Sequence, residues 1–307
     1  MKRGNLIFVT GILIICIIVV LSYLFVISRR QVQQDPNNPV FVSPAAELTA
    51  RLLNISGDVQ VRPRDHEWQA TIKGQSLLPG TQLRTGEGAK AELLVGKDLH
   101  INVTAGTDIR LGDIGPNLAR LFVGEGVVLA NVKSEQGPRL QIANRNGEAV
   151  AETGDGALTV SVDANGELRT AVTKGSATVA ANGETVNINA GFYSIAGAGR
   201  KPSKPASVPQ SLLLKVRWPT IATTSKRHQL ISGATSVGAR IRVAGQTIWA
   251  DKQGRFNTIV DLQEGKNRIQ LRVTDVVGRE SSETSPEIEL YTKAPSQKIE
   301  TSPEMWK

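Results

Sequence analysis

The sequence predicts an all-β protein behind one N-terminal transmembrane helix. Three observations carry this prediction: short Val-rich segments that alternate with period two, recurrent Gly-containing turn signals between them, and one uncharged apolar run near the N-terminus. The 307 residues give room for about two domains. With a single cysteine the chain has no intramolecular disulfide, so hydrophobic cores must hold it together.

Residues 6–27 form an apolar run without a charged side chain, and as a helix they would span about 33 Å, enough to cross a bilayer. The run ends before Arg29 and Arg30 without the small residues of a cleavage site, so we expect the helix to be retained. Cys16 follows Ile15 where a lipobox needs a small residue, which predicts no lipidation. Two positive side chains flank the run on each side, so they do not decide its orientation. The α-amino group adds a positive charge at the N-terminus and favours a cytoplasmic stub at 1–5.

The segment after the helix, residues 28–50, contains three prolines and reads as an extended linker. Beyond it, five segments show the strand alternation: 58–61, 91–95, 99–103, 127–132 and 158–162. The triplet Asn-Gly-Glu recurs at Asn146, Asn165 and Asn182, and Asn-Gly is the preferred pair of type I′ hairpins. Residues 51–196 are therefore expected to form a β-solenoid or rolled sheet of repeated hairpins.

Residues 197–211, rich in Gly, Pro, Ser and Lys, read as a second linker. From 212 to 293 glycines recur mostly seven to eleven residues apart, which is typical of the turns of a small β-sandwich. The tail, residues 294–307, is expected to be disordered.

The opening of the first β region carries a recognisable series of residues. A Gly-x-Val-x-Val strand is followed by a Trp, a Gly-x-x-Leu-x-Pro-Gly turn and a Leu-x-Thr: Gly57, Val59, Val61, Trp68, Gly74, Leu77, Pro79, Gly80, Leu83 and Thr85. This region resembles the FecR periplasmic domain. The resemblance covers about residues 51–196, although residues 151–156 lack the family's Arg-Gly-Thr. It implies the fold and a periplasmic location; five residues are too few for the family's cytoplasmic sigma-factor-binding domain.

The second β region has an Asp-x-x-Gly-x-Phe hairpin at 251–256, a Leu-x-x-Gly-x-Asn at 262–267 and an Asp-x-x-Gly at 275–278. These motifs resemble bacterial Ig-like modules of the type appended to glucodextranases. The resemblance implies a module that binds or spaces and does not catalyse.

Positive charge is concentrated in this second region. Residues 51–199 carry 14 Lys/Arg against 16 Asp/Glu, whereas residues 200–307 carry 18 against 10. Arg240, Arg242, Arg268 and Arg272 alternate with apolar residues, so on neighbouring strands they are expected to point outward as one exposed patch. Such a patch suits an anionic envelope polymer or an acidic protein; plain solubility explains it equally well.

No residue pattern signals catalysis. Gly86, Gly88 and Ala91 match the dinucleotide fingerprint, but the segment joins two expected strands and reads as a turn. The sequences 65–67 (Asp-His-Glu) and 163–166 (Asp-Ala-Asn-Gly) read as a solvated loop and a hairpin turn. His100 can share a strand face with Asp98, without a nucleophile nearby. The sequence thus predicts neither an enzyme nor a bound cofactor or metal.

Two functions follow from this organisation. The first is a non-enzymatic binding or scaffold protein, anchored in the bacterial inner membrane by residues 6–27, with its bulk in the periplasm. Its expected partners are an envelope protein or an anionic glycan such as peptidoglycan or lipopolysaccharide, and no nucleic acid is expected. The alternative is a FecR-like signalling subunit that acts through a membrane partner.

Overall fold

The computed structural model describes residues 49–133, 138–197 and 199–292, and this part of the chain is all-β, without a helix. The all-β prediction is therefore confirmed. The expected stub, transmembrane helix and first linker, and the expected disordered tail, lie outside the described residues. Two hydrophobic cores contain most of the buried apolar side chains, one within residues 50–196 and one within residues 231–290.

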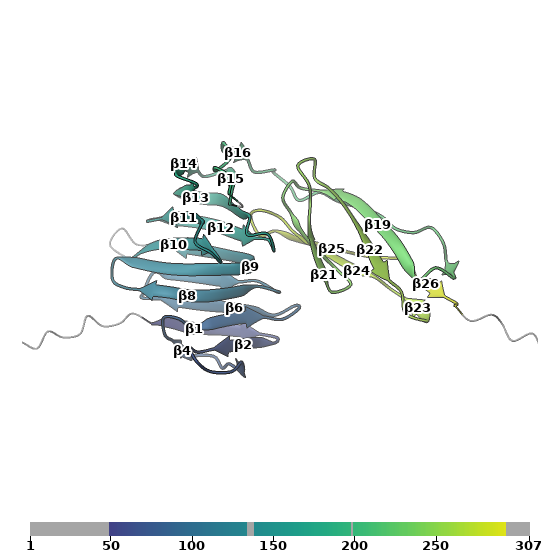
Figure 1. Ribbon diagram of the computed structural model, residues 1–307, viewed down its shortest axis with the longest axis horizontal. Helices are drawn as coiled ribbons and strands as arrows, with labels where there is room; N and C mark the ends of the chain where they lie inside the picture. The colour runs from purple at the N-terminus through teal and green to yellow at the C-terminus, as the bar shows by residue number, and fades with distance from the viewer. Residues whose placement is uncertain (1–48, 134–137, 198, 293–307) are drawn as a thin grey trace, which may run out of the picture. The chain divides into compact units, whose positions relative to one another are not determined.

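The strands around the first core follow one another with short connections. They are β1 (Ala50–Ser56), β2 (Val59–Arg62), β3 (Gln69–Ala70), β4 (Ser76–Leu77), β5 (Gln82–Thr85), β6 (Lys90–Val95), β7 (Leu99–Val103), β8 (Asp108–Ile114), β9 (Leu118–Val132), β10 (Arg139–Asn144), β11 (Ala149–Thr153), β12 (Gly156–Val162), β13 (Leu168–Ala181), β14 (Glu184–Asn189), β15 (Phe192–Ala196) and β16 (Ala206–Ser207). All belong to one sheet, whose strands are stacked like rungs in Figure 1. The five segments with strand alternation lie in β2, β6, β7, β9 and β12, as predicted.

Alternation decides which side chains enter the core. In β6 the buried residues are Ala91, Leu93 and Val95, and the intervening positions are exposed or half-buried. Strand β7 repeats the pattern in antiparallel register with β6. Because each fully buried leucine contributes roughly 1.5 to 3 kcal/mol, rows of this kind supply most of the stability.

Two long strands connect the halves of this sheet. The first part of β9 pairs with β8 and β10, and its second part pairs with β7 and β12; β13 changes partners in the same way. Gly126 lies where β9 changes partners, with φ of +122°, and a Cβ there would lie 2.3 Å from Thr107 Oγ1. The Val127 N–H donates to the same hydroxyl at 3.0 Å. Glycine therefore permits the close approach that the crossing requires.

The strands around the second core are shorter. They are β17 (Leu214–Arg217), β18 (Thr223–Thr224), β19 (His228–Thr235), β20 (Arg240–Val243), β21 (Gln246–Trp249), β22 (Arg255–Asp261), β23 (Gly265–Asn267), β24 (Gln270–Thr274), β25 (Glu280–Thr284) and β26 (Ile288–Leu290). They form three sheets, ordered β17-β19-β22, β18-β26-β23 and β21-β20-β24-β25. Strands β20 and β24, which carry Arg240, Arg242 and Arg272, are antiparallel neighbours, as predicted.

The segment predicted as a second linker is not a free tether. Strand β16 pairs with β15 and extends the first sheet, and the Ser203 and Val208 N–H groups donate to the carbonyls of Ile195 and Gly191. Its end is held from the other side, because Arg279 donates to the carbonyls of Pro209 and Gln210 at 2.7 and 2.6 Å. The described residues accordingly belong to one compact unit.

The three Asn-Gly pairs occupy tight turns, as predicted. Gly147, Gly166 and Gly183 all have positive φ, and the first two close hydrogen-bonded turns. Only at Asn182-Gly183 do both residues have positive φ, so the expected type I′ geometry is confirmed at that pair alone. The other two connections are longer and place only the glycine in the left-handed region.

A second turn recurs three times. Asp163, Asp251 and Asp275 each begin an Asp-x-x-Gly turn, in which Oδ1 accepts the N–H groups of the residues two and four positions later. In each turn the Gly N–H donates to the Asp carbonyl. These hydrogen bonds explain why an aspartate begins each turn. They include the turn at 163–166, which the sequence predicted as a hairpin turn.

Gly166→Val should destabilise the protein by about 1 to 2 kcal/mol, because valine at φ of +79° is strained. The free energy of unfolding in urea measures the change. Gly154→Val is the control, since Gly154 has no positive φ and its nearest neighbour would lie 4.0 Å from the new Cβ. Equal losses in the two variants would contradict the assigned strain.

Asp275→Ala should cost about 2 to 3 kcal/mol, because the buried carboxylate accepts two backbone N–H bonds and a 2.6 Å bond from Arg279. Asp251→Ala removes the same turn bonds at a solvent-exposed carboxylate and should cost less. Urea unfolding of the pair tests the ranking, and a larger loss in Asp251→Ala would show that burial does not set it.

Candidate functional site

Arg240, the first residue of β20, is buried, with 2% of its surface exposed. Its guanidinium donates to the carbonyls of Ala105 and Gly106 at 2.8 and 3.4 Å and lies 3.5 Å from Thr104 Oγ1. Burial lowers the pKa of Arg240 to about 10, so it stays protonated at neutral pH. The prediction that Arg240 lies in an exposed patch is therefore wrong, because the loop between β7 and β8 covers this position.

The other three arginines of the predicted patch are divided. Arg242 and Arg272 are half-buried partners on β20 and β24, and a Cβ on Gly106 would lie 2.7 Å from Arg242 Nη1. Arg268 is exposed and lies 3.6 Å from the Glu287 carboxylate. The four side chains do not form one shared surface, since a loop of the first sheet reaches two of them and an acidic side chain pairs with a third.

A different arginine, Arg169 of β13, lies where side chains of both β regions meet. Its Nη2 donates to Asp163 Oδ2 at 3.3 Å and to Glu167 Oε1 at 2.5 Å. Its guanidinium carbon lies 4.4 Å from the centre of the Trp249 ring, which comes from β21. The residue is 6% exposed, yet Nε and Nη1 have no hydrogen-bond partner among the described residues.

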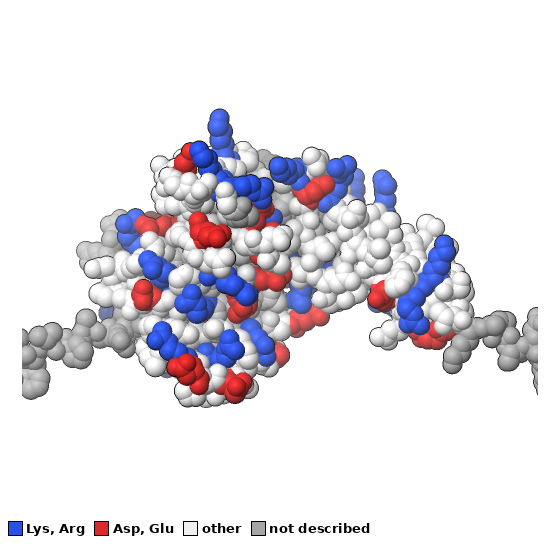
Figure 2. Space-filling view, viewed as in Figure 1, with Lys and Arg blue, Asp and Glu red and all other residues white. Residues whose placement is uncertain are grey.

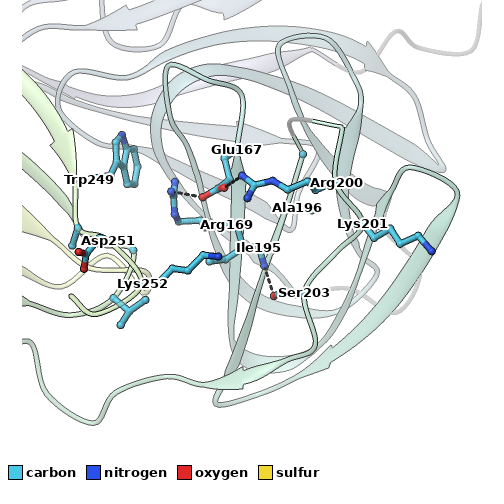
Figure 3. Close-up of a pocket in the computed structure, with 14 residues that line it drawn as sticks. Glu167, Arg169, Ile195, Ala196, Arg200, Lys201, Ser203, Trp249, Asp251 and Lys252 are labelled. Carbon is cyan, nitrogen blue, oxygen red and sulfur yellow. Dashed lines mark hydrogen bonds and ion pairs between the residues drawn. The ribbon is translucent and has the colours of Figure 1, made fainter. Parts of the chain in front are cut away.

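Arg169 lines a cavity of about 450 Å³, which we call the Arg169 cavity. Figure 3 shows Glu167 between Arg169 and Arg200, with Trp249, Asp251 and Lys252 on the opposite wall. Its lining residues are Glu167, Arg169, Ile195, Ala196, Gly197, Arg200, Lys201, Ser203, Val237, Gly238, Trp249, Ala250, Asp251 and Lys252. The cavity is thus lined by the flanks of two Asp-x-x-Gly turns, 163–166 and 251–254, by six residues between Ile195 and Ser203, and by Val237 and Gly238.

A second cavity, of about 710 Å³, shares Trp249 and Asp251 with the first; we call it the Arg217 cavity. It is lined by Lys215, Arg217, Ser232, Gly233, Ala234, Ile248, Trp249, Asp251, Arg255, Phe256 and Asn257. Trp249 therefore lies between two hollows that both contain cationic side chains.

Both acidic side chains that line the cavities have cationic partners. Glu167 accepts from Arg169 and Arg200, and Asp251 lies 3.4 Å from Arg255 Nε. Backbone hydrogen bonding by Arg255 lowers the pKa of Asp251. Lys252, Lys215 and Arg217 are exposed and make no ion pair with the described residues. The cavities therefore carry an excess of positive charge.

Elsewhere on the molecule the charges are mixed. Figure 2 shows Lys and Arg interspersed with Asp and Glu over the visible face, without one continuous basic field. An additional cluster surrounds Trp68, whose ring lies 4.9 Å from the Arg62 guanidinium and 4.2 Å from that of Arg84. Trp68 thus stacks with arginines on the outer face of β2 and β5.

The other residues of the motif at 57–85 lie in the core or in turns. Leu77 is buried, and the Thr85 hydroxyl donates to the Thr104 carbonyl at 2.6 Å. The three glycines, Gly57, Gly74 and Gly80, all have positive φ, and Pro79 precedes the last of them. The motif therefore consists largely of turn and core positions.

The catalytic candidates stay apart from the cavities. His66 lies in a loop, where its Nδ1 contacts the Arg64 carbonyl, and His100 pairs with Glu92 at 3.2 Å instead of with Asp98. Hydrogen bonds from Asn54 and His100 lower the pKa of Glu92. The Gly86–Ala91 fingerprint spans the connection from β5 into β6, a turn between strands as predicted. Among residues 49–133, 138–197 and 199–292, no group of three His, Cys, Asp or Glu side chains is placed to hold a metal ion.

Sequence reasoning missed Arg169, Trp249 and Lys252. A local signal was available, since 163–169, 251–255 and 275–279 each contain an Asp-x-x-Gly turn followed by Arg. That signal predicts the turns but not that two of them meet.

Comparison with known proteins gives little to add to this geometry. No protein-family model matches the chain, and no curated protein matches it. Two crystal structures of a "putative anti-sigma factor" from Parabacteroides distasonis ATCC 8503 are similar, each with 14% sequence identity and a TM-score of 0.35. The match covers 41% of this chain and 60% of the solved chain, so this chain matches less than two thirds of that protein.

Within the part of the chain that the structure describes, no helix has the length and apolar character needed to cross a bilayer.

Arg169→Met should destabilise the protein by about 3 kcal/mol, because it removes the buried partner of Asp163 and Glu167. Arg200→Met removes an exposed partner of the same Glu167, and should cost about 1 kcal/mol or less. Urea unfolding of both variants measures the difference. Losses of equal size would contradict the buried role of Arg169.

Proposed function

We propose that the chain is a membrane-anchored, non-enzymatic binding and scaffold protein of the bacterial cell envelope. In this proposal residues 6–27 form the anchor helix, residues 51–196 a FecR-like rolled sheet and residues 212–293 an Ig-like β-sandwich, with both β regions in the periplasm. The observation that carries the proposal is the cation-lined pair of cavities on either side of Trp249.

Three further observations support a binding role. The two cavities are concave and have the size of ligand sites, 300 to 1,000 Å³ as a rough range. Arg240 donates to the 104–106 loop, and Arg279 donates to the carbonyls at 209–210, so hydrogen bonds outside the cavity also join the two β regions that form its walls. The charge around the cavities suits an anionic glycan or an acidic surface of an envelope protein.

The proposed topology predicts that a reporter active only in the cytoplasm is inactive when fused to Lys307, and that a reporter active only outside it is active. The full chain should remain in the membrane fraction. Deleting residues 2–30 is the control, and should reverse both reporters, because the uncharged segment is the proposed export signal and anchor. Cytoplasmic activity of the intact fusion would overturn the proposal.

Crosslinking in intact cells, followed by purification of the full chain, separates the scaffold from the signalling alternative. A scaffold should capture envelope components through the periplasmic part. Capture of an integral membrane protein that persists when the cavity cations are replaced would favour the FecR-like signalling subunit instead.

A further inference from the structure

Trp249 and Asp251 line both the Arg169 cavity and the Arg217 cavity, so the two hollows adjoin at these side chains. We propose that together they form one groove for an acidic oligosaccharide, a sugar chain that bears carboxylate or phosphate groups. The location in which the protein would meet such a ligand rests on the proposed function. The chemistry of the ligand follows from the residues that line the groove.

The buried arginine supplies the first argument. Arg169 is 6% exposed, and its Nε and Nη1 lack an acceptor among the described residues. Each of these two nitrogens exposes less than 1 Å², so the guanidinium acts on the cavity through its charge and not through donors open to a ligand. The wall of the Arg169 cavity therefore carries a buried positive charge that favours an anionic group beside it.

The exposed cations extend this preference along the groove. Lys252 lines the Arg169 cavity, whereas Lys215 and Arg217 line the Arg217 cavity, and none of the three forms an ion pair within the described part of the chain. Cations on both sides of Trp249 favour a ligand that carries several separated negative charges over one that carries a single anionic end.

The neutral and acidic lining favours a sugar chain. Ser232 and Asn257 offer hydrogen bonds to the hydroxyl groups of a sugar, whereas the Ser203 hydroxyl and the carboxylates of Glu167 and Asp251 already have partners within the protein. A polynucleotide brings a phosphate at each residue and is best held by successive aromatic platforms. Here Arg169 stacks on Trp249 and takes part of its ring surface. The remaining indole surface suits the apolar side of one sugar ring.

The size of the groove sets the length of the ligand. The cavities measure about 450 and 710 Å³, each within the usual range for a small-molecule site. Two adjoining cavities of this size match an oligosaccharide better than a single sugar.

The test uses the full chain purified in detergent micelles, with binding followed by calorimetry and by tryptophan fluorescence. The acidic probes are a galacturonate hexamer, which carries carboxylates, and the phosphorylated core oligosaccharide of lipopolysaccharide. Maltohexaose is the neutral probe, and a thymidine hexanucleotide is the polyphosphate probe. The two acidic probes distinguish the source of the anionic group.

The decisive variant replaces three exposed cations, Lys215→Gln, Arg217→Gln and Lys252→Gln. Its matched control removes the same charge outside both cavities, with Lys97→Gln, Lys174→Gln and Lys226→Gln. At least one acidic sugar should bind the unaltered chain, and its binding should weaken at high salt. Its affinity should be about tenfold lower for the decisive variant and should stay within about twofold for the control variant. Trp249→Phe should remove the fluorescence change.

The proposal is overturned if neither acidic sugar binds, or if maltohexaose or the nucleotide binds as tightly as the acidic sugars. It is also overturned if the two triple variants lose affinity equally. Because the measurement uses purified protein, it does not depend on topology. A failed reporter experiment with successful sugar binding would remove the envelope location and leave the ligand chemistry. Failed sugar binding with a correct topology would leave the scaffold and remove the glycan.

Discussion

Two arginine side chains that the fold removes from water determine how its two β regions meet. Desolvating a guanidinium is costly unless its donors find acceptors. Arg240 finds three oxygen atoms, all within 104–106, and so ties β20 to the β7–β8 loop. Arg169 donates through Nη2 only, to Asp163 and Glu167, and faces Trp249. Both arginines keep donors without an acceptor among the described residues, Nε in Arg240 and Nε and Nη1 in Arg169. Arg169 also lines a cavity, where its positive charge favours binding of an anion.

Local alternation was sufficient to predict the strands and insufficient to predict what covers them. In β6, β7 and β12 the apolar positions recur with period two, and they enter the core as expected. The same rule placed Arg240 outward on β20, which is correct in direction, but outward there means against the 104–106 loop. That contact joins residues about 135 positions apart in the sequence, and nothing in the periodicity of either segment encodes it.

Composition misled in two further places for physical reasons. The Gly- and Pro-rich segment 197–211 reads as a tether, yet Ala206 and Ser207 pair with the open edge of β15, because an unpaired strand edge offers backbone donors and acceptors to any neighbouring extended segment. Summed charge placed the basic surface in the last third of the chain, where Lys215, Arg217 and Lys252 do line the cavities. It gave no sign of the arginines that stack with Trp68 in the first β region, because a segment's net charge says nothing about which side chains gather on one face.

The candidate groove depends on the reuse of one short turn in different surroundings. Each Asp-x-x-Gly turn is followed by an arginine that pairs with the aspartate of the turn. The Arg169–Asp163 pair is buried, and so is Asp275 in the third turn, whereas the Arg255–Asp251 pair is exposed to solvent. Gly278 of the third turn packs against Leu129 of β9, where a Cβ would lie 2.8 Å from the leucine side chain. Arg169, after the first turn, and Gly278, in the third, therefore contact the other β region, and Asp251 of the second turn lines the cavity between the two regions. The sequence specifies the turns locally, but only their meeting places Trp249 over Arg169 and creates a cavity between them.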